Sequence, residues 1–338
     1  MSDPYFSIIM PSYNAAPYIK EAIDSIVSQS FKDWELIIVD DGSKDSTAHI
    51  LKEYDPEHRI KIEFLSENTG NPFLVRERAL SFARGEYIVT LDADDLLGEG
   101  YLERLLAAIK TYQADLVLTD MWRLRDDKCF KILPKDIFSY CKEYKGKELV
   151  KHTLVEWDLP IAGFAVRKEI YSSAYTMAHT HNHDSIHADE LLSRYLLFLS
   201  PKVVFTEASY FYRINENSIT HTDDLIRLKS QFITNSALLE FTEQRFGKDS
   251  EEYQKSVTQQ WLLLISVLNF LNEKSLKGKR KEEILRIYGR EKKRLKKLAI
   301  KPDIKWYYKG IIEFPVALGK PALKGLKFLK KVKKPLRK

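Results

Sequence analysis

Segments of strand type and helix type alternate over the first hundred residues of this 338-residue chain. The strand-type segments are short runs rich in β-branched and other apolar residues, and they are Phe6–Met10, Trp34–Val39, Ile60–Leu65 and Tyr87–Leu91. The helix-type segments between them are Pro17–Ser28, Ser46–Leu51, with Ser46 as the cap, and Leu74–Ala83. This alternation predicts an α/β fold in which a mostly parallel, Rossmann-like sheet with right-handed crossovers is flanked by helices.

Polar side chains follow each of these four strands. They are Ser12, Tyr13 and Asn14 after the first strand, Asp40 and Asp41 after the second, Glu67 and Asn68 after the third, and Asp92 and Asp94 after the fourth. Because the carboxyl ends of parallel strands meet at one edge of a sheet, we expect the four clusters to converge there. Ligands bind at this edge in open α/β sheets, so the sequence predicts a binding site built from the four loops.

The fourth strand ends in three carboxylates, Asp92, Asp94 and Asp95, within four residues. Like charges packed this closely cost free energy unless a cation lies among them. Carboxylate oxygens suit Mg²⁺ or Mn²⁺, which in turn bind the phosphates of a substrate. The pattern therefore predicts a metal–diphosphate site. The alternative is a solvated acidic turn in which Asp95 caps the next helix.

Several other kinds of site are not indicated. The first strand is followed by no Gly-x-Gly-x-x-Gly motif, and the chain has no Gly-x-x-x-x-Gly-Lys-Ser/Thr motif, which argues against dinucleotide and P-loop sites. The two cysteines, Cys129 and Cys141, lack metal-type spacing and predict no disulfide framework. The net charge is +6, but residues 314–338 hold nine Lys or Arg and no acid, which leaves about −3 for the rest. We therefore expect no nucleic-acid partner.

Five segments together resemble the family 2 glycosyltransferases, which have the GT-A fold. The segments are Ile9-Met10-Pro11-Ser12-Tyr13-Asn14, Ile38-Val39-Asp40-Asp41-Gly42-Ser43, Asn68-Thr69-Gly70, Arg76, and Ala83-Arg84-Gly85-Glu86-Tyr87-Ile88 with Leu91-Asp92-Ala93-Asp94-Asp95. Their order and spacing fit over about residues 5–120, and more loosely to about residue 220. The resemblance implies an inverting enzyme that uses a nucleoside diphosphate sugar, usually a UDP-sugar, with Mn²⁺ or Mg²⁺ as cofactor.

The resemblance also implies roles for the residues at matching positions. Pro11, Tyr13 and Asp41 would hold the base and ribose of the donor. Asp92 would contact ribose or sugar, and Asp94 would bind the metal ion with Asp92 beside it. The other donor-binding residues are predicted to be Ser12, Asn14, Asn68, Gly70, Arg76 and Ala93. Glu77 departs from the family pattern, which has Asn after this Arg.

An acidic pair, Asp189 and Glu190, stands at the start of a predicted apolar helix at Leu191–Leu199. From the residues alone, this pair is interpreted as the start of a helix, where the helix dipole stabilises negative charge. The resemblance places an acidic pair here, with one member as general base, and we favour Asp189 for that role. A sugar hydroxyl is a poor nucleophile at neutral pH, so a nearby carboxylate must accept its proton.

Three further features between residues 157 and 221 have two interpretations each. Trp157 is a sugar-stacking platform or a core residue. The histidines of His179–His183 bind zinc, or they lie on an exposed loop beside the acceptor. Near the segment Tyr212–Thr220, which resembles the family's Tyr-Arg-x-x-x-x-Ser-Ile-Thr, Arg213 or His221 contacts the diphosphate, or the segment is a structural lid.

We predict a catalytic domain over residues 1–222, with a donor half to about residue 120 and an acceptor half over 121–222. A helix at Tyr101–Tyr112 and a strand at Asp115–Thr119 are expected at the end of the donor half. The acceptor half is expected to contain a mixed insertion at Met121–Lys151 and strands at Val203–Phe205 and Tyr210–Arg213. A helical region follows over residues 223–300, with helices at Leu225–Phe246, Glu251–Leu271 and Glu282–Leu298.

Residues 301–338 form the predicted basic tail. Drawn as a helix from Pro321, this tail has apolar and Lys-rich arcs, which predicts that residues 314–338 bind an anionic membrane surface. The alternative is a disordered, solubilising tail. No signal peptide is evident, and the longest apolar run, at Trp261–Leu271, is too short to span a bilayer. We therefore expect a cytoplasmic protein on the inner face of the cell membrane.

The leading hypothesis is a transferase that moves a sugar from a UDP-sugar to a hydroxyl of a glycan or lipid-linked glycan, as in capsule or other surface polysaccharide synthesis. One alternative is a sugar-nucleotide nucleotidyltransferase, although Pro11–Asn14 offers neither the Gly-rich loop nor the Lys that such an enzyme needs. The other alternative is a non-catalytic scaffold that binds polyanions or membranes through the tail.

Overall fold

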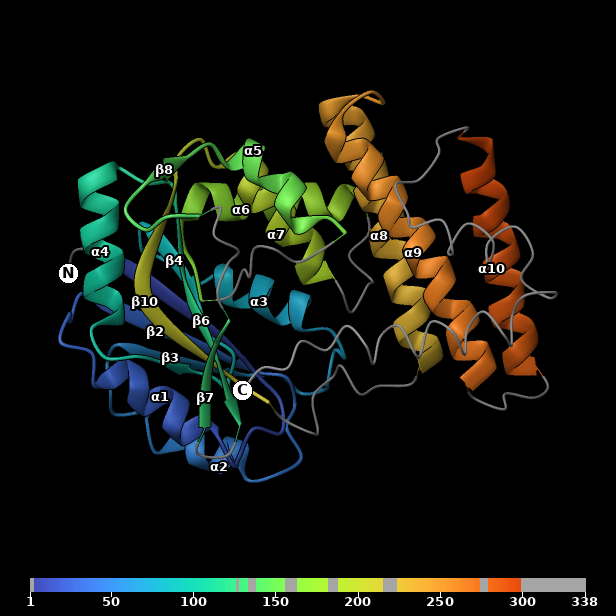
Figure 1. The fold of residues 1–338 in the computed structure, drawn as a ribbon. Helices are drawn as coiled ribbons and strands as arrows, with labels where there is room; N and C mark the ends of the chain where they lie inside the picture. Colours follow the sequence, from blue (N-terminus) through green and yellow to red (C-terminus); the bar gives the residue numbers. More distant parts are fainter. Residues whose placement is uncertain are drawn as a thin grey trace. The chain divides into compact units, whose positions relative to one another are not determined.

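A mixed sheet lies at the centre of the first of two compact units in the computed structural model of the chain (Figure 1). The structure describes residues 3–125, 128–132, 138–155, 163–181, 188–214, 224–273 and 279–298. The two units are Met1–Thr222 and Asp223–Lys338. The edge of the sheet where the sequence predicts a ligand belongs to the first unit.

The first half of the sheet is parallel, as the sequence predicts. Its strands are β1 (Phe6–Ser12), β2 (Trp34–Asp40), β3 (Ile60–Phe64) and β4 (Tyr87–Thr90), in the spatial order β3-β2-β1-β4. Every residue of β2 is buried, which explains why Leu36–Val39 is a continuous apolar run rather than an alternating one. Strand order reverses direction at β1, so the crevice at the carboxyl ends of β1 and β4 is where a ligand is expected.

Helices cover both faces of this half-sheet. On one face, α1 (Ile19–Val27), α2 (Thr47–Lys52) and α4 (Tyr101–Tyr112) share an apolar core with the strands. On the other face, α3 (Pro72–Leu80) packs against β1 and β2. Helix α3 begins two residues earlier than predicted, because Pro72 suits the first turn and the Asn71 side chain accepts a hydrogen bond from the Phe73 N–H at 3.1 Å.

Ser46 lies at the N-cap position of α2, but its side chain makes no capping hydrogen bond. The Thr47 N–H donates to the Asp45 carboxylate instead, at 3.0 Å. The prediction of a Ser46 cap was therefore right about position and wrong about the group that satisfies the backbone.

The second half of the sheet departs further from the prediction. Its strands are β5 (Leu96–Leu97), β6 (Leu116–Arg125), β7 (Lys128–Ile132), β8 (Glu143–Tyr144), β9 (Ala165–Arg167) and β10 (Val203–Arg213). Strand β9 pairs antiparallel with both β4 and β6 and so joins the two halves. The mixed insertion predicted from Met121 begins instead as a β6–β7 hairpin. Two predicted strands are one strand, β10, with an irregularity between Thr206 and Ser209.

Three short helical segments complete the described part of this unit, namely α5 (Gly146–Leu149) with the 3₁₀ turn Val150–Thr153, α6 (Lys168–His181) and α7 (Ala188–Leu199). Helix α7 packs against α5 and α6. Its residues from Leu191 to Leu197 are all buried, which fits the apolar pattern that predicted this helix.

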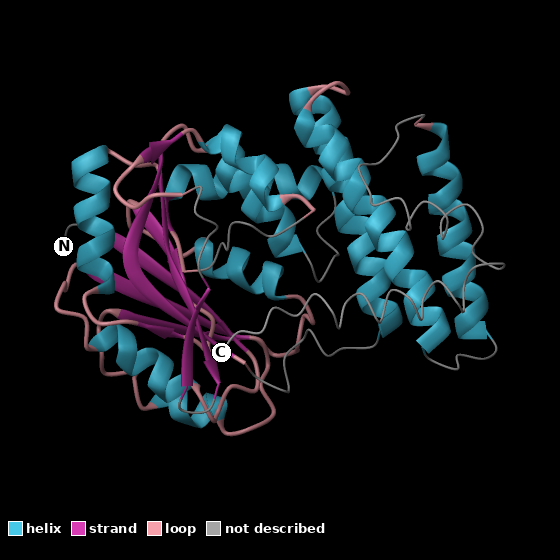
Figure 2. Cartoon of the chain, viewed as in Figure 1, coloured by secondary structure: helices cyan, strands magenta, loops and turns pink. Residues whose placement is uncertain are grey.

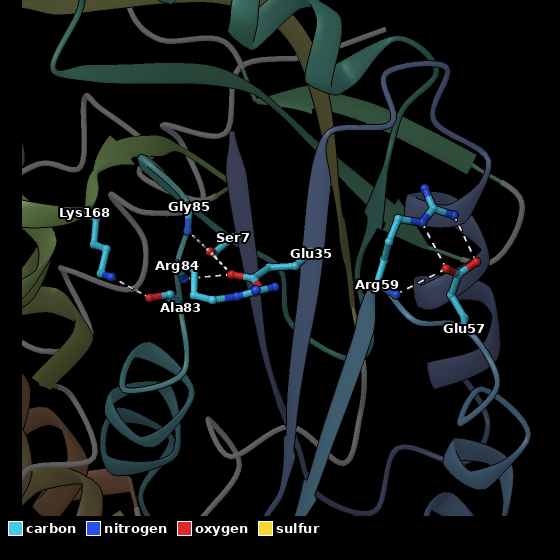
Figure 3. A network of polar contacts seen from close by, with 8 residues as sticks. All are labelled: Ser7, Glu35, Glu57, Arg59, Ala83, Arg84, Gly85 and Lys168. Carbon is cyan, nitrogen blue, oxygen red and sulfur yellow. Dashed lines mark hydrogen bonds and ion pairs between the residues drawn. The ribbon is translucent and has the colours of Figure 1, made fainter. Parts of the chain in front are cut away.

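A buried polar network fixes the opposite, amino ends of the strands (Figure 3). The Glu35 carboxylate accepts from the Ser7 hydroxyl and the Arg84 N–H, both at 2.7 Å, and from the Arg84 guanidinium at 2.8 and 3.0 Å. The Gly85 N–H donates to the Ser7 hydroxyl at 2.7 Å. A Cβ on Gly85 would lie 2.5 Å from the Ser7 nitrogen, so only glycine allows this approach. The Arg84-Gly85 turn thus sets where β4 starts.

The described part of the second unit is helical throughout (Figure 2). Its helices are α8 (Asp224–Phe246), α9 (Glu251–Glu273) and α10 (Lys279–Lys297), close to the three predicted. They share one apolar core, which includes Phe232, Trp261, Leu264 and Ile284. Among the described helices, none combines the length and apolarity needed to cross a bilayer.

Candidate active site

The acidic turn after β4 is tied to β10 by its third carboxylate. Asp95 is 1% exposed, and its carboxylate accepts from the Tyr210 hydroxyl at 2.5 Å and from the Arg213 N–H at 2.8 Å. The N-cap position of the following helix, α4, is Gly100. The alternative in which Asp95 caps that helix is therefore wrong: Asp95 instead holds the turn in place.

Burial raises the pKa of Asp95 well above its usual value, and the neighbouring charges of Asp92 and Asp94 add to the effect. Burial also raises the pKa of the Tyr210 hydroxyl, and the nearby charge of Asp95 raises it further. The turn thus concentrates negative charge in a poorly solvated place, and it favours binding of a positive charge there.

The chain supplies one such charge itself, from α3. An Arg76 guanidinium nitrogen lies 2.5 Å from the Asp92 carboxylate, and the Arg76 side chain is 15% exposed. Burial alone would lower the pKa of Arg76, but Asp92, followed by Tyr175, Tyr171 and Asp189, more than offsets it and the pKa is raised. Arg76 therefore stays ionised and orients Asp92.

The acidic pair at the start of α7 faces the same space. Asp92, Asp189 and Glu190 all line one cavity of about 230 Å³, which Arg76 also lines. The other walls include Thr90 from β4, Met121 from β6, and Tyr210 and Tyr212 from β10. The structure thus brings together two acidic segments that are almost a hundred residues apart in the sequence.

Within that pair the two carboxylates have different surroundings. Asp189 is exposed, and its Oδ1 accepts the Glu190 N–H at 2.9 Å. Glu190 is half-buried and lies above Arg194, one turn further along α7, with 3.9 Å between the Glu190 carboxylate and the Arg194 guanidinium. The prediction that this pair begins a helix is confirmed, and the exposed position of Asp189 leaves its carboxylate open to a ligand.

Arg194 is a residue that the sequence reasoning missed. It is fully buried, and its guanidinium donates to the carbonyl oxygens of Glu190 and of Thr153, the latter at 2.7 Å. Burial lowers the pKa of Arg194 to about 10, although Glu190 and Asp189 act in the opposite direction. A single Arg inside the apolar run Leu191–Leu199 was the available signal, since such a residue is seldom buried without carboxylate or carbonyl partners.

The loops that follow β1, β2 and β3 are joined by hydrogen bonds. Asp41 is buried, and its carboxylate accepts from the Thr69 N–H at 2.8 Å and the Thr69 hydroxyl at 3.0 Å. The Asn14 side chain accepts from the Lys44 N–H at 2.8 Å, and Asn68 accepts from the Gly70 N–H. Convergence of these loops at the carboxyl edge of the sheet is as the sequence predicts.

Of the predicted site residues, Arg76, Asp92, Asp189 and Glu190 line the cavity. Other predicted residues lie at the end of β1 or in the loops that follow the strands: Pro11 and the buried Ser12 are the last two residues of β1, Tyr13 is 43% exposed, and Ala93 is buried. Asp94 accepts the Arg213 guanidinium through its backbone carbonyl, at 2.9 Å. Arg213 also lies 2.6 Å from the Glu21 carboxylate, which supports its structural interpretation.

The remaining expectations have different outcomes. His179 lies in α6, contacts the Glu77 carboxylate and packs edge-on to Phe73, so the expected loop does not begin there. Trp157, His183, His221 and residues 301–338 lie outside the described residues. Across the described ranges, no three or more His, Cys, Asp or Glu side chains are grouped so that they could hold a metal ion.

A parallel sheet with polar loops at its carboxyl edge, a fixed acidic turn and an opposed carboxylate pair defines the GT-A class of fold. In agreement, the chain resembles the crystal structure of TarS residues 1–349 from S. aureus in complex with UDP-GlcNAc. The TM-score is 0.64 at 17% identity, over 96% of this chain and 91% of that one.

Sequence comparison then gives the family. Residues 7–172 match the model of Glycosyl transferase family 2. The glycosyltransferase GlyG of Streptococcus pneumoniae is 25% identical over 246 residues, which is 69% of this chain and 80% of GlyG. The poly(ribitol-phosphate) beta-N-acetylglucosaminyltransferase TarS of Staphylococcus aureus is 35% identical over 118 residues, 34% of this chain and 21% of TarS. The chain therefore carries a family 2 glycosyltransferase domain with the GT-A fold.

The matched segments span very different shares of the relatives. They cover most of GlyG but 32% of the glycosyltransferase GlyA of Streptococcus pneumoniae, which is 25% identical over 224 residues. The family match supports the transferase interpretation over the nucleotidyltransferase and scaffold alternatives.

Proposed function

We propose that the protein transfers a sugar, with inversion, from a UDP-sugar to a hydroxyl of a glycan or lipid-linked glycan in surface polysaccharide synthesis. The observation that carries this proposal is the cavity where the Arg76–Asp92 pair and the Asp189–Glu190 pair face each other. Two relatives support the substrates: TarS is crystallised with UDP-GlcNAc and with UDP, and GgaB of Bacillus subtilis, 41% identical over 103 residues, is a minor teichoic acid biosynthesis protein.

In this proposal the connected loops after β1, β2 and β3 bind the nucleotide. The exposed ring of Tyr13 contacts the base, and Asp41, fixed by Thr69, accepts from the base or ribose. Arg76 keeps the Asp92 carboxylate in one orientation, where Asp92 accepts from a hydroxyl of the ribose or of the transferred sugar. The donor is thereby held with its anomeric carbon toward α7.

The acceptor hydroxyl lies between that carbon and Asp189. Asp189 accepts the hydroxyl proton while the oxygen attacks C1 from the face opposite the diphosphate, and the bond from C1 to the diphosphate oxygen breaks. The nucleoside diphosphate leaves with the bonding electron pair, and the anomeric configuration inverts. We assign the base to Asp189 rather than Glu190, because Asp189 is exposed whereas Glu190 is held against Arg194.

A divalent cation fits this arrangement. Mg²⁺ is commonly held by one or two carboxylates together with substrate phosphates rather than by a complete protein cage, so Asp94 with Asp92 is a sufficient protein contribution. Asp95 is not one of these groups, since its carboxylate is occupied by Tyr210 and Arg213. When bound, Mn²⁺ or Mg²⁺ would neutralise charge on the leaving diphosphate.

The first prediction tests the base. Asp189→Asn is expected to lower the transfer rate roughly 10²- to 10⁴-fold, because proton transfer by a positioned side chain contributes about that much. UDP binding, measured by calorimetry, should stay within about twofold of wild type. Glu148→Gln serves as the control, since Glu148 is an exposed residue of α5 outside the cavity. Wild-type turnover in both Asp189→Asn and Glu190→Gln would refute the proposed function.

The second prediction tests the cation. Asp94→Ala is expected to raise the Mn²⁺ concentration that gives half-maximal transfer by roughly tenfold or more, because loss of even a residue that only supports a metal ligand typically lowers metal affinity about 10- to 100-fold. Chelation should abolish transfer by the wild type, and added Mn²⁺ should restore it. Asp55→Ala, at an exposed turn, is the control. Full activity of the chelated enzyme would exclude the metal role.

A further inference from the structure

Helix α10 carries a dense positive charge that the catalytic proposal does not use. Its sequence from Lys279 to Lys297 contains ten Lys or Arg and three Glu. The apolar side of the helix is already occupied, because Ile284, Ile287, Tyr288 and Leu295 are buried in the core of the second unit. The exposed side is therefore largely cationic, with Leu285, which is 44% exposed, as an apolar side chain among the charges.

Much of this charge is not neutralised by neighbouring acids. In the part of the chain that the structure describes, no ion pair involves Arg286, Lys293, Lys296 or Lys297. All four side chains are exposed. Uncompensated cations on one helix repel one another, so the surface favours a ligand that brings several negative charges.

A groove between α8 and α10 adds shape to the charge. It has a volume of about 610 Å³, with an apolar floor of Phe232, Ile233 and Ile287. Its rim carries Lys229, Arg286, Arg290 and one acid, Glu283. The Lys229 ammonium lies 2.5 Å from the Glu283 carboxylate, and the Arg290 side chain, which is 71% exposed, has its Nε 2.9 Å from the Glu291 carboxylate and its other two nitrogens available to a ligand. The groove thus combines an apolar base with two exposed guanidinium groups.

An exposed apolar side chain lies beside these cations. Ile226 is 55% exposed and precedes Lys229 and Ile233 by three and seven residues on α8, so all three share one side of that helix. Exposed apolar groups next to Lys and Arg suit the interface of a lipid bilayer, where acyl chains and phosphates lie close together. A hydrophilic phosphodiester polymer would gain nothing from the apolar floor or from Ile226.

The chain's own C-terminal segment does not fit this groove. Residues 314–338 contain nine Lys or Arg and no acid, so they would be repelled by the rim.

We propose that the α8–α10 groove and the exposed side of α10 bind the surface of a bilayer rich in anionic phospholipid, with a phosphate headgroup between Arg286 and Arg290. This inference is independent of the proposed catalytic function, because it concerns binding in the absence of donor and acceptor.

The test is sedimentation of the full-length chain with vesicles of phosphatidylcholine alone and of phosphatidylcholine with 30% phosphatidylglycerol. Binding is expected for the anionic vesicles and to weaken with salt. The double variant Arg286→Gln/Arg290→Gln should bind roughly 30-fold more weakly, because each basic residue near such a surface contributes about fivefold. Gln keeps both positions polar, and circular dichroism checks that the helices remain.

The matched control is Lys248→Gln/Lys255→Gln, which removes two cations from the same unit outside the groove. It should bind within about threefold of wild type. An equal loss in both double variants would overturn the proposal, because net charge alone would then explain binding. So would unchanged binding by the groove variant, equal binding to uncharged vesicles, or displacement from anionic vesicles by millimolar inorganic phosphate, which would indicate a site for a soluble anion.

Discussion

Arg194 shows how a single buried charge connects helix α7 to the body of the domain. Its guanidinium binds the Thr153 carbonyl on one side and the Glu190 carbonyl on the other, within a fully buried environment. A charge placed there fixes the first turn of α7, where both candidate bases lie.

We therefore expect Arg194→Met to lower the transfer rate by up to roughly 10²-fold, because the first turn of α7 loses the guanidinium that binds the Glu190 and Thr153 carbonyl oxygens, and a misplacement of about 1 Å can cost that much. The KM for the donor should change little. Arg167→Met is the control: Arg167 pairs with Asp115 and Glu86 outside the cavity, so its loss should lower stability without lowering the transfer rate of the folded protein. An unchanged transfer rate in a folded Arg194→Met protein would restrict Arg194 to a role in stability.

At the scale of elements, the Glu35 network joins β1, β2 and the turn before β4. Burial acts to raise the pKa of Glu35, but the hydrogen bonds from Ser7 and Arg84 outweigh burial and bring that pKa below its usual value. A carboxyl group with a lowered pKa in the folded state stabilises the fold above its unfolded pKa of 4.5, and this stabilisation is lost as pH falls through the folded pKa. The network therefore becomes weaker in acid.

Glu35→Gln is expected to lower the free energy of unfolding at pH 7 by about 1.5–3 kcal/mol, the range for a hydrogen bond to a charged group. The difference from wild type should be constant near neutral pH and shrink below pH 4.5. Glu57→Gln is the comparison: Glu57 pairs with Arg59 in the same turn (Figure 3), whereas Glu35 joins separate elements. Denaturant titrations at several pH values measure both, and a Glu35→Gln difference that grows in acid would contradict this account.

The same elements show what the sequence can predict. Strand β2 and helix α4 were predicted because each has an apolar pattern that local spacing reveals. Strand β9 has only three residues, and its place between β4 and β6 depends on pairing with residues that are distant in the sequence. For the site, the acidic residues were visible as a motif, but the Tyr210–Asp95 contact joins residues 115 positions apart and leaves no local signal.

At the scale of the whole molecule, the described residues separate two kinds of chemistry. The first unit holds the acidic cavity with Asp92 and Asp189, and the second holds the cationic groove with Arg286 and Arg290. Opposite charge in two units of one chain is consistent with transfer chemistry in one and membrane binding in the other. The basic residues 314–338, which follow in the sequence, would add to the second function.

Deletion of residues 314–338 is therefore expected to move most of the protein from the membrane fraction of cells to the soluble fraction, because nine positive charges are removed. A full-length chain with those nine residues changed to Gln should behave like the deletion if charge, rather than length, is responsible. Adding Arg286→Gln/Arg290→Gln to the deletion should remove the remaining salt-sensitive binding to anionic vesicles. An unchanged membrane fraction after the deletion would rule out the tail as an anchor, and the vesicle assay would then report on the groove alone.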